Sequence, residues 1–230
     1  MPIRLVPGFS QPASIWDDVT AALDPALDVR ALDVPDGLGF AATAAALADS
    51  VTAPACWVGY SLGGRLVLQL AADRPDAVEA LVLVSTTAGI EDAAARSARA
   101  DQDEADAVAI EQDGVDAFLA RWVAQPIFAT LPPARRALDA RAAAMTTARL
   151  AHQMRALGQG AMTPLWDRLA EITVPVTVVT GRADAKYTAI GERLVDALPH
   201  AELAVIPGGH SLSLESPAAL AAAIAHAATR

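Results

Sequence analysis

The sequence predicts a protein of the α/β class, with a mostly parallel sheet that has helices on both faces. Short apolar runs of strand length alternate with segments of helical periodicity, and this alternation is typical of parallel sheets. A serine flanked by glycines stands where one apolar run meets a helical segment. The expected strands are 3–6, 29–34, 55–58, 78–84, 174–179 and 203–206. A chain of 230 residues is within reach of one domain.

Helical segments are expected between these strands. The first covers residues 15–23 and the second residues 41–50. The third, 65–72, directly follows the serine and its glycines, and Pro75 stops it. The last, 218–228, is amphipathic and too short to cross a bilayer.

The alternation stops after Ser85. From residue 89 to 160 alanine, charged residues and helical spacing dominate, and no strand-like run occurs. We therefore expect a helical cap over the carboxyl edge of the sheet, inserted into an α/β core formed by residues 1–88 and 161–230.

The serine motif is Gly-Tyr-Ser-Leu-Gly at residues 59–63, which matches the G-x-S-x-G pattern of a nucleophile elbow. Small neighbours let the strand and the helix meet at a sharp angle, so the Ser61 hydroxyl stands clear of the sheet. Backbone N–H groups at the start of the helix then face an incoming anion. Alone, the pattern also fits a glycine-rich turn with a capping serine.

Asp184 follows the expected strand 174–179 and His210 follows the expected strand 203–206, just as Ser61 follows the expected strand 55–58. The chain order Ser, Asp, His is that of the α/β-hydrolase fold, and open α/β sheets place their sites beyond the carboxyl ends of strands. The imidazole would take the proton of the serine, and the carboxylate would fix the imidazole tautomer. We expect these three residues to be catalytic. The other histidines are expected to have surface or packing roles: His152, His200 and His226.

Two backbone N–H groups are candidates for an oxyanion hole. Leu62 follows the nucleophile, and Phe9 lies in the loop after the first strand, where the fold supplies its second donor. Many hydrolases of this fold have His-Gly in that loop, whereas this chain has Pro7-Gly8. The histidine side chain that would anchor the loop is therefore missing, although the backbone donor can survive.

Arg65 lies one helical turn beyond Ser61. A cation near a helix N-terminus is disfavoured by roughly 0.3–1 kcal/mol, so a nearby negative charge should compensate. Local sequence leaves two candidates equally open, which are an ion pair with an aspartate and a carboxylate of the substrate.

Composition excludes several classes of function. The formal net charge of −10 argues against nucleic acid or an anionic membrane as a partner. No residues have metal-ligand spacing and no nucleotide-binding motif occurs, so neither a metal nor a cofactor is expected. The single cysteine, Cys56, cannot form an internal disulfide and is expected in the core. The first residues lack the features of a signal peptide, so a cytoplasmic location is expected.

Several segments together resemble one branch of this superfamily. They are the elbow 59–65 with its tyrosine and arginine, the sequence Trp-Val-Ala-Gln-Pro-Ile-Phe at 122–128, and the segments 155–160 and 184–187. Over nearly its whole length the chain resembles the 2-succinyl-6-hydroxy-2,4-cyclohexadiene-1-carboxylate synthases of menaquinone biosynthesis.

The resemblance implies a lyase that eliminates pyruvate from 2-succinyl-5-enolpyruvyl-6-hydroxy-3-cyclohexene-1-carboxylate. Ser61 would then act as a base rather than as a nucleophile. The resemblance also implies residues that bind this small polyanionic substrate: Tyr60, Arg65, Arg99, Trp122 and Arg141. For the cap arginines, a solvated helix face paired with nearby acids is the competing interpretation.

Two other functions stay open at this point. One is a serine hydrolase of a small ester, lactone or thioester on the same fold. The other is a non-catalytic ligand-binding protein, against which the intact serine, aspartate and histidine argue. The sequence leaves open whether the chain is a monomer or a homodimer.

Overall fold

In the computed structural model, which describes residues 1–229, six strands form one sheet in which every neighbouring pair is parallel. The strands are β1 (Ile3–Val6), β2 (Val29–Ala31), β3 (Ala55–Tyr60), β4 (Val78–Val84), β5 (Val176–Gly181) and β6 (Ala201–Ile206). Their order across the sheet is β2-β1-β3-β4-β5-β6. The parallel sheet and its alternation with helices confirm the predicted fold class.

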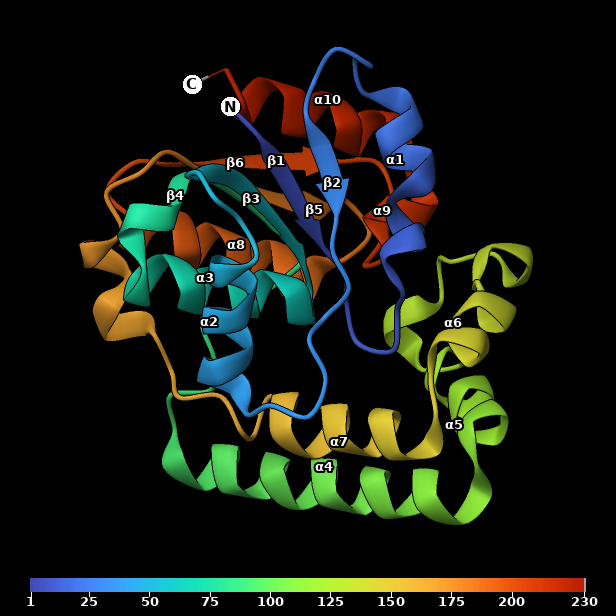
Figure 1. The fold of residues 1–230 in the computed structure, drawn as a ribbon. Coiled ribbons are helices and arrows are strands. Elements are labelled where there is room, and N and C mark those ends of the chain that lie inside the picture. Colours follow the sequence, from blue (N-terminus) through green and yellow to red (C-terminus); the bar gives the residue numbers. More distant parts are fainter. Residues whose placement is uncertain (230) are drawn as a thin grey trace.

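Helices cover both faces of this sheet (Figure 1). The helices that connect or follow the strands are α1 (Asp17–Ala22), α2 (Phe40–Asp49), α3 (Leu62–Asp73), α8 (Ala185–Ala197), α9 (Leu212–Glu215) and α10 (Pro217–Ala227). Short 3-10 turns occur at Ala13–Trp16, Pro75–Ala77, Pro126–Phe128, Pro133–Arg135 and Trp166–Glu171. Helices α1 and α10 lie on one face, and α2, α3 and α8 lie on the other.

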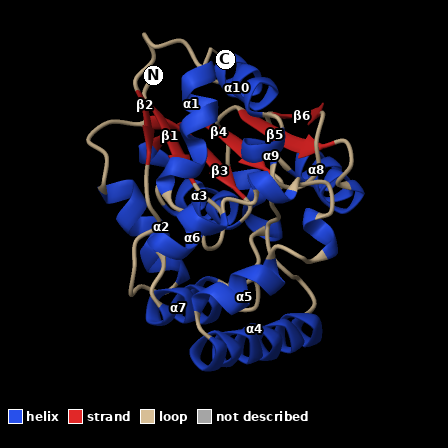
Figure 2. Cartoon of the chain, turned by 90° about the vertical axis from the view of Figure 1, so that its right-hand side faces the viewer, coloured by secondary structure: helices blue, strands red, loops and turns tan. Residues whose placement is uncertain are grey.

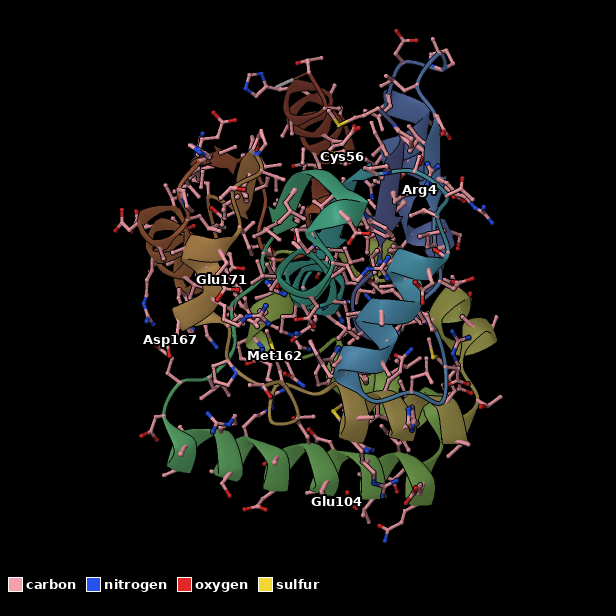
Figure 3. All side chains as sticks on the ribbon, turned by 60° about the vertical axis from the view of Figure 1, so that its left-hand side comes forward. Arg4, Cys56, Glu104, Met162, Asp167 and Glu171 are labelled. Carbon is pink, nitrogen blue, oxygen red and sulfur yellow. The ribbon has the colours of Figure 1, made fainter. Side chains whose placement is uncertain are left out.

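Alternation along the strands divides the core of the sheet into two clusters. Cys56 and Val58 point to the cluster that contains α1 and α10, and Figure 3 shows Cys56 close to α10. Trp57, Leu81 and Leu83 belong to the cluster on the opposite face, with residues of α2 and α3. Both faces are therefore buried, which accounts for the continuously apolar strands in the sequence.

Several strand ends differ from the prediction: β3 continues to Tyr60 and β5 to Gly181, and β6 begins at Ala201. Strand β2 ends at Ala31, because its partner β1 ends at Val6 and the last register pair joins Leu5 to Ala31. Asp33 instead accepts a hydrogen bond from the Ala13 N–H at 2.8 Å. Strand β5 begins at Val176 rather than at residue 174, in keeping with proline's lack of an N–H for the ladder at position 175.

Between β4 and β5 the described structure contains α4 (Ala93–Asp113), α5 (Val115–Trp122), α6 (Leu138–Ala144) and α7 (Thr147–Leu157). Of these helices, α4, α5 and α7 lie on the side of the molecule away from the sheet, and α6 lies nearer to it (Figure 2). They share an apolar cluster of their own: Ala107, Ile110, Phe118, Leu119, Met145, Leu150, Ala151 and Met154. Figure 3 shows Glu104 on the outer side of α4 and Met162 on its inner side.

The chain enters and leaves this helical segment at neighbouring points. The Leu165 N–H donates to the Ala88 carbonyl oxygen at 2.8 Å. The Trp166 indole N–H donates to the Gly89 carbonyl oxygen at 2.9 Å. Within residues 1–229, no helix has the length and apolar character that crossing a membrane requires.

Candidate active site

Ser61 occupies the turn between β3 and α3 in a strained backbone conformation, with φ 51° and ψ −106°. A Cβ atom on Gly63 would collide with the Val6 carbonyl oxygen, and one on Gly59 would collide with the backbone of Gly63. The Thr86 hydroxyl donates to the Ser61 carbonyl oxygen at 2.8 Å. Close backbone packing and this hydrogen bond therefore fix the turn that carries the serine.

Asp184 and His210 are joined by a buried hydrogen bond. The carboxylate of Asp184 caps α8, because its Oδ1 accepts from the Tyr187 N–H at 3.3 Å. The other oxygen, Oδ2, lies 2.7 Å from His210 Nδ1. Since an ionised carboxylate only accepts hydrogen bonds, the proton of this bond is assigned to Nδ1, which leaves Nε2 as the ring nitrogen that can accept a proton.

Ser61 and His210 line the same cavity, which has a volume of about 730 Å³. Among residues 1–229, neither the Ser61 hydroxyl nor His210 Nε2 has a hydrogen-bond partner. Catalytic hydrogen bonds are often long without substrate and tighten in the complex. The structure thus joins aspartate to histidine and brings the serine to the same cavity.

Aromatic rings surround the imidazole. The centroid of the His210 ring lies 4.5 Å from that of Tyr187, 5.5 Å from that of Tyr60 and 6.1 Å from that of Phe128. The Tyr60 hydroxyl is 3.1 Å from Ser211 Oγ, and burial raises the pKa of Tyr60. Tyr60 therefore contributes a neutral apolar wall beside the histidine.

The loop after β1 lies against the elbow and is held by residues from the helical segment. Arg141 Nη1 donates to the Phe9 carbonyl oxygen at 3.2 Å and to Ser10 Oγ at 2.8 Å. Gln153 Oε1 accepts from the Ser10 N–H at 3.3 Å. Within the described part of the chain, the N–H groups of Phe9 and Leu62 have no hydrogen-bond partner. Arg141 and Gln153 thus anchor the loop that contains Pro7, where the sequence has no histidine to do so.

Arg65 is buried, with 6% of its surface exposed. Its Nη1 donates to the Gly158 carbonyl oxygen at 3.1 Å, and its guanidinium lies over the Phe40 ring at 5.5 Å. In the described chain no carboxylate forms a salt bridge with it, so an ion pair with an aspartate is not what compensates this charge. Burial lowers the pKa of Arg65 to about 10, which leaves the side chain protonated at neutral pH.

The arginines of the helical segment have different partners. Arg99 Nε donates to Asp103 Oδ1 at 2.7 Å, and one third of the Arg99 side chain is exposed. Arg141 is 1% exposed, and burial lowers its pKa to about 10. Its Nη2 is buried without a hydrogen-bond partner among residues 1–229. The ion pair between Arg99 and Asp103 agrees with the interpretation of Arg99 as part of a solvated helix face, but Arg99 also lines the cavity. Arg141 is buried, so that interpretation does not hold for it.

All the site residues expected from the sequence line this one cavity: Phe9, Tyr60, Ser61, Leu62, Arg65, Arg99, Trp122, Arg141, Asp184 and His210. Trp122 contributes through its ring, whose centroid is 4.8 Å from that of Phe9. Their roles in catalysis and binding stay predictions.

The cavity has further lining residues that the sequence analysis did not single out, among them Lys186 and Gln159. The signal for Lys186 was its place two residues after Asp184, in a segment noted only as a family match. Gln159 Nε2 donates to the Tyr187 hydroxyl at 3.3 Å, a contact between distant segments that sequence spacing does not reveal. Among the described residues, no group of three or more metal-binding side chains is placed to hold a metal ion.

A family model, known sequences and a solved structure all resemble this chain. The model of the alpha/beta hydrolase family matches residues 5–223. A Bacillus subtilis protein named as a 2-succinyl-6-hydroxy-2,4-cyclohexadiene-1-carboxylate synthase is 35% identical over 167 residues, which are 70% of this chain and 60% of that protein. The synthase of that name from Enterobacter sp. (strain 638) is 32% identical over 232 residues, covering 95% of this chain and 88% of the relative. The structure of MenH from S. aureus has a similar fold, with a TM-score of 0.91, 23% identity, and coverage of 98% of this chain and 92% of that one.

Proposed function

Because the chain belongs to the alpha/beta hydrolase family and, within it, to the 2-succinyl-6-hydroxy-2,4-cyclohexadiene-1-carboxylate synthases, we propose that it is the lyase of menaquinone biosynthesis that eliminates pyruvate from 2-succinyl-5-enolpyruvyl-6-hydroxy-3-cyclohexene-1-carboxylate. The chain spans 60% of the length of the Bacillus subtilis relative. The proposed activity therefore depends on the residues of this chain itself.

The observation that carries the proposal is the charge of the cavity. Arg65, Arg99, Arg141 and Lys186 line it, against Asp106 and Asp184. The chain as a whole has a formal net charge of −10, so positive charge is concentrated at this place. The substrate carries three carboxylates, on its enolpyruvyl, succinyl and ring positions. Guanidinium groups bind carboxylates through strong, directed hydrogen bonds, and this charge complementarity favours the polyanion over a neutral ester.

Ser61 starts the reaction as a base. Its hydroxyl passes its proton to His210 Nε2, and Asp184 stabilises the imidazolium through Nδ1. The Ser61 oxygen then takes the proton from the carbon next to the succinyl ketone. The electron pair of the broken C–H bond moves onto the ketone oxygen and forms an enolate. When the enolate collapses, a double bond forms between C2 and C3, the existing C3=C4 bond shifts to C4=C5, and the C5–O bond to the enolpyruvyl group breaks. Pyruvate leaves as its enolate and takes up the proton that His210 received, so Ser61 and His210 return to their starting protonation states.

The N–H groups of Phe9 and Leu62 stabilise the oxygen of the succinyl ketone, where negative charge develops. Each such donor is worth roughly 2.7–4 kcal/mol when it is fixed in place. The helical segment 89–160 covers the site as a cap and supplies Arg99, Trp122 and Arg141. It thereby reduces access of water to the developing enolate.

Release of pyruvate from the cyclohexene substrate, followed with lactate dehydrogenase and NADH, tests the proposal. We expect turnover by the wild-type chain and its loss in Ser61→Ala. Absence of pyruvate from the wild-type reaction would overturn the lyase assignment.

A serine hydrolase of small esters is the second candidate, and the strained elbow with free N–H groups beside it is the observation that favours it. In that case Ser61 attacks a carbonyl carbon and forms an acyl-enzyme. Incubation with p-nitrophenyl acetate separates the two functions. Fast ester turnover without release of pyruvate supports the hydrolase, and full biological activity of Ser61→Ala supports a non-catalytic binding protein.

A further inference from the structure

The carboxylate of Glu215 spans the loop that carries His210. Its Oε2 accepts a hydrogen bond from the Gly209 N–H at 2.8 Å, and its Oε1 accepts one from the Ser211 N–H at 3.0 Å. These are the backbone groups directly before and after the histidine. Glu215 itself is half-buried at the end of α9, where its N–H donates to the Ser211 carbonyl oxygen at 2.9 Å.

This loop needs such a fixing contact. It begins with two glycines, which have more conformational freedom than other residues, and Gly208 has φ +118°. Hydrogen bonds to a charged acceptor are about twice as strong as neutral ones, so a carboxylate that accepts from both flanking N–H groups holds the backbone firmly. Packing adds to this, because a Cβ atom on Gly209 would collide with the Thr130 hydroxyl oxygen.

We propose that Glu215 is a positioning residue, whose carboxylate fixes the backbone on both sides of His210 and so holds the imidazole between Asp184 and the cavity. The proposal rests on the proposed function, because that function assigns His210 as the proton acceptor. Glu215 is not among the residues that line the cavity, so it acts through the histidine and not on the substrate.

Three variants test this role. Glu215→Gln preserves the shape but replaces one acceptor oxygen by an NH₂ group, which faces a backbone donor. Glu215→Asp keeps the charge but shortens the side chain, so it cannot reach both N–H groups. Glu192→Gln is the control, because it removes the same charge from an exposed position on α8.

The first readout is kinetic. A displacement of about 1 Å in a catalytic group can cost about 10²-fold in rate, so we expect kcat for pyruvate release to fall about 10- to 100-fold in Glu215→Gln. KM stays within twofold, because the arginines that bind the carboxylates are untouched. We expect a smaller fall in Glu215→Asp and none in Glu192→Gln. If Glu215→Gln impaired only folding, the thermal midpoint and the fraction of active molecules would fall. The molecules that stay folded would then have a normally positioned His210.

The second readout needs no substrate. We expect the His210 Nδ1 proton, which is hydrogen-bonded to Asp184, to give a low-field proton NMR signal that shifts or broadens in Glu215→Gln but not in Glu192→Gln. The rate of Ser61 labelling by a fluorophosphonate should fall in parallel. A wild-type signal and labelling rate in Glu215→Gln would overturn the proposal. If that variant does not fold, the same result in Glu215→Asp overturns it. Failure of the wild-type chain to release pyruvate refutes the proposed function alone, because the signal and the labelling rate still decide the role of Glu215.

Discussion

Replacing Asp103 by asparagine perturbs two of the cavity arginines at once. The Asp103 carboxylate accepts from Arg99 Nε at 2.7 Å and from the Gly160 N–H at 3.0 Å. It also packs against Gly158, whose carbonyl oxygen accepts from Arg65. A buried side chain of the cap thus orients Arg99 directly and Arg65 through the backbone of residues 158–160.

The magnitude follows from burial and charge. Asparagine has one acceptor oxygen, so it loses one of the two hydrogen bonds and the ionic part of the other. A hydrogen bond to a charged group contributes about 1.5–3 kcal/mol. Asp103 is 3% exposed but Arg99 is 33% exposed, so solvent screening places the loss near the lower end, at about 2 kcal/mol. For a domain of this size that lowers the thermal midpoint by roughly 4–8 °C.

The catalytic consequence should appear in KM. Loosening Arg99 weakens its hold on a substrate carboxylate, and about 1.4 kcal/mol corresponds to a tenfold change in affinity. We expect KM for the cyclohexene substrate to rise about tenfold while kcat stays within twofold, measured by steady-state release of pyruvate. Asp101→Asn is the matched control, since Asp101 is exposed on the same helix. If Asp103→Asn changes KM and the midpoint no more than this control does, the assigned role of Asp103 is wrong.

Four further outcomes are expected. Ser61→Ala should lower kcat at least 10³-fold but preserve the stabilisation of the protein by a bound dicarboxylate in a thermal shift assay; retained turnover would contradict the mechanism. Arg65→Ala should lower kcat/KM about 10²-fold through loss of a charge-assisted bond worth about 2–3 kcal/mol, and unchanged steady-state kinetics would count against its role. Gly63→Ala should lower the thermal midpoint, because its Cβ would collide with the Val6 carbonyl oxygen; a wild-type midpoint by circular dichroism would refute this. Burial raises the pKa of the Cys56 thiol to about 12 from its ordinary value of 9.0. The thiol should therefore not react with Ellman's reagent in the native protein at pH 8. Because only the unfolded thiol ionises between about pH 9 and 12, the contribution of Cys56 to the free energy of unfolding should be lost over that range.

The parts of the fold that depend on local pattern were predictable from the sequence. Apolar runs located the six strands, and the glycines around Ser61 located the elbow, because sterics at a sharp turn demand them. The end of β2 was not predictable in this way. It depends on where β1 stops, and β1 is separated from β2 in the chain by α1.

The candidate site likewise has a part that the sequence predicted and a part that it did not. The order of Ser61, Asp184 and His210 along the chain predicted that they would approach one cavity, which they line. The partner of Arg65 is the carbonyl oxygen of Gly158, 93 residues away, and no local signal distinguishes that contact from an ion pair. The contacts of Asp103 and Glu215 were missed for a related reason, since both carboxylates bond to backbone N–H groups, which carry no sequence signature.

Two hydrogen bonds, from Leu165 to Ala88 and from Trp166 to Gly89, join the two ends of the helical segment. They have a consequence for protein engineering. Because both ends of the insert are tied at one place, a segment from a relative can be grafted between them without altering the spacing of β4 and β5. Such a chimera would inherit the arginines of its donor and keep Ser61, Asp184 and His210 of the recipient. Ligand preference would then be exchanged with the helical segment, separately from the three residues that we propose transfer the proton.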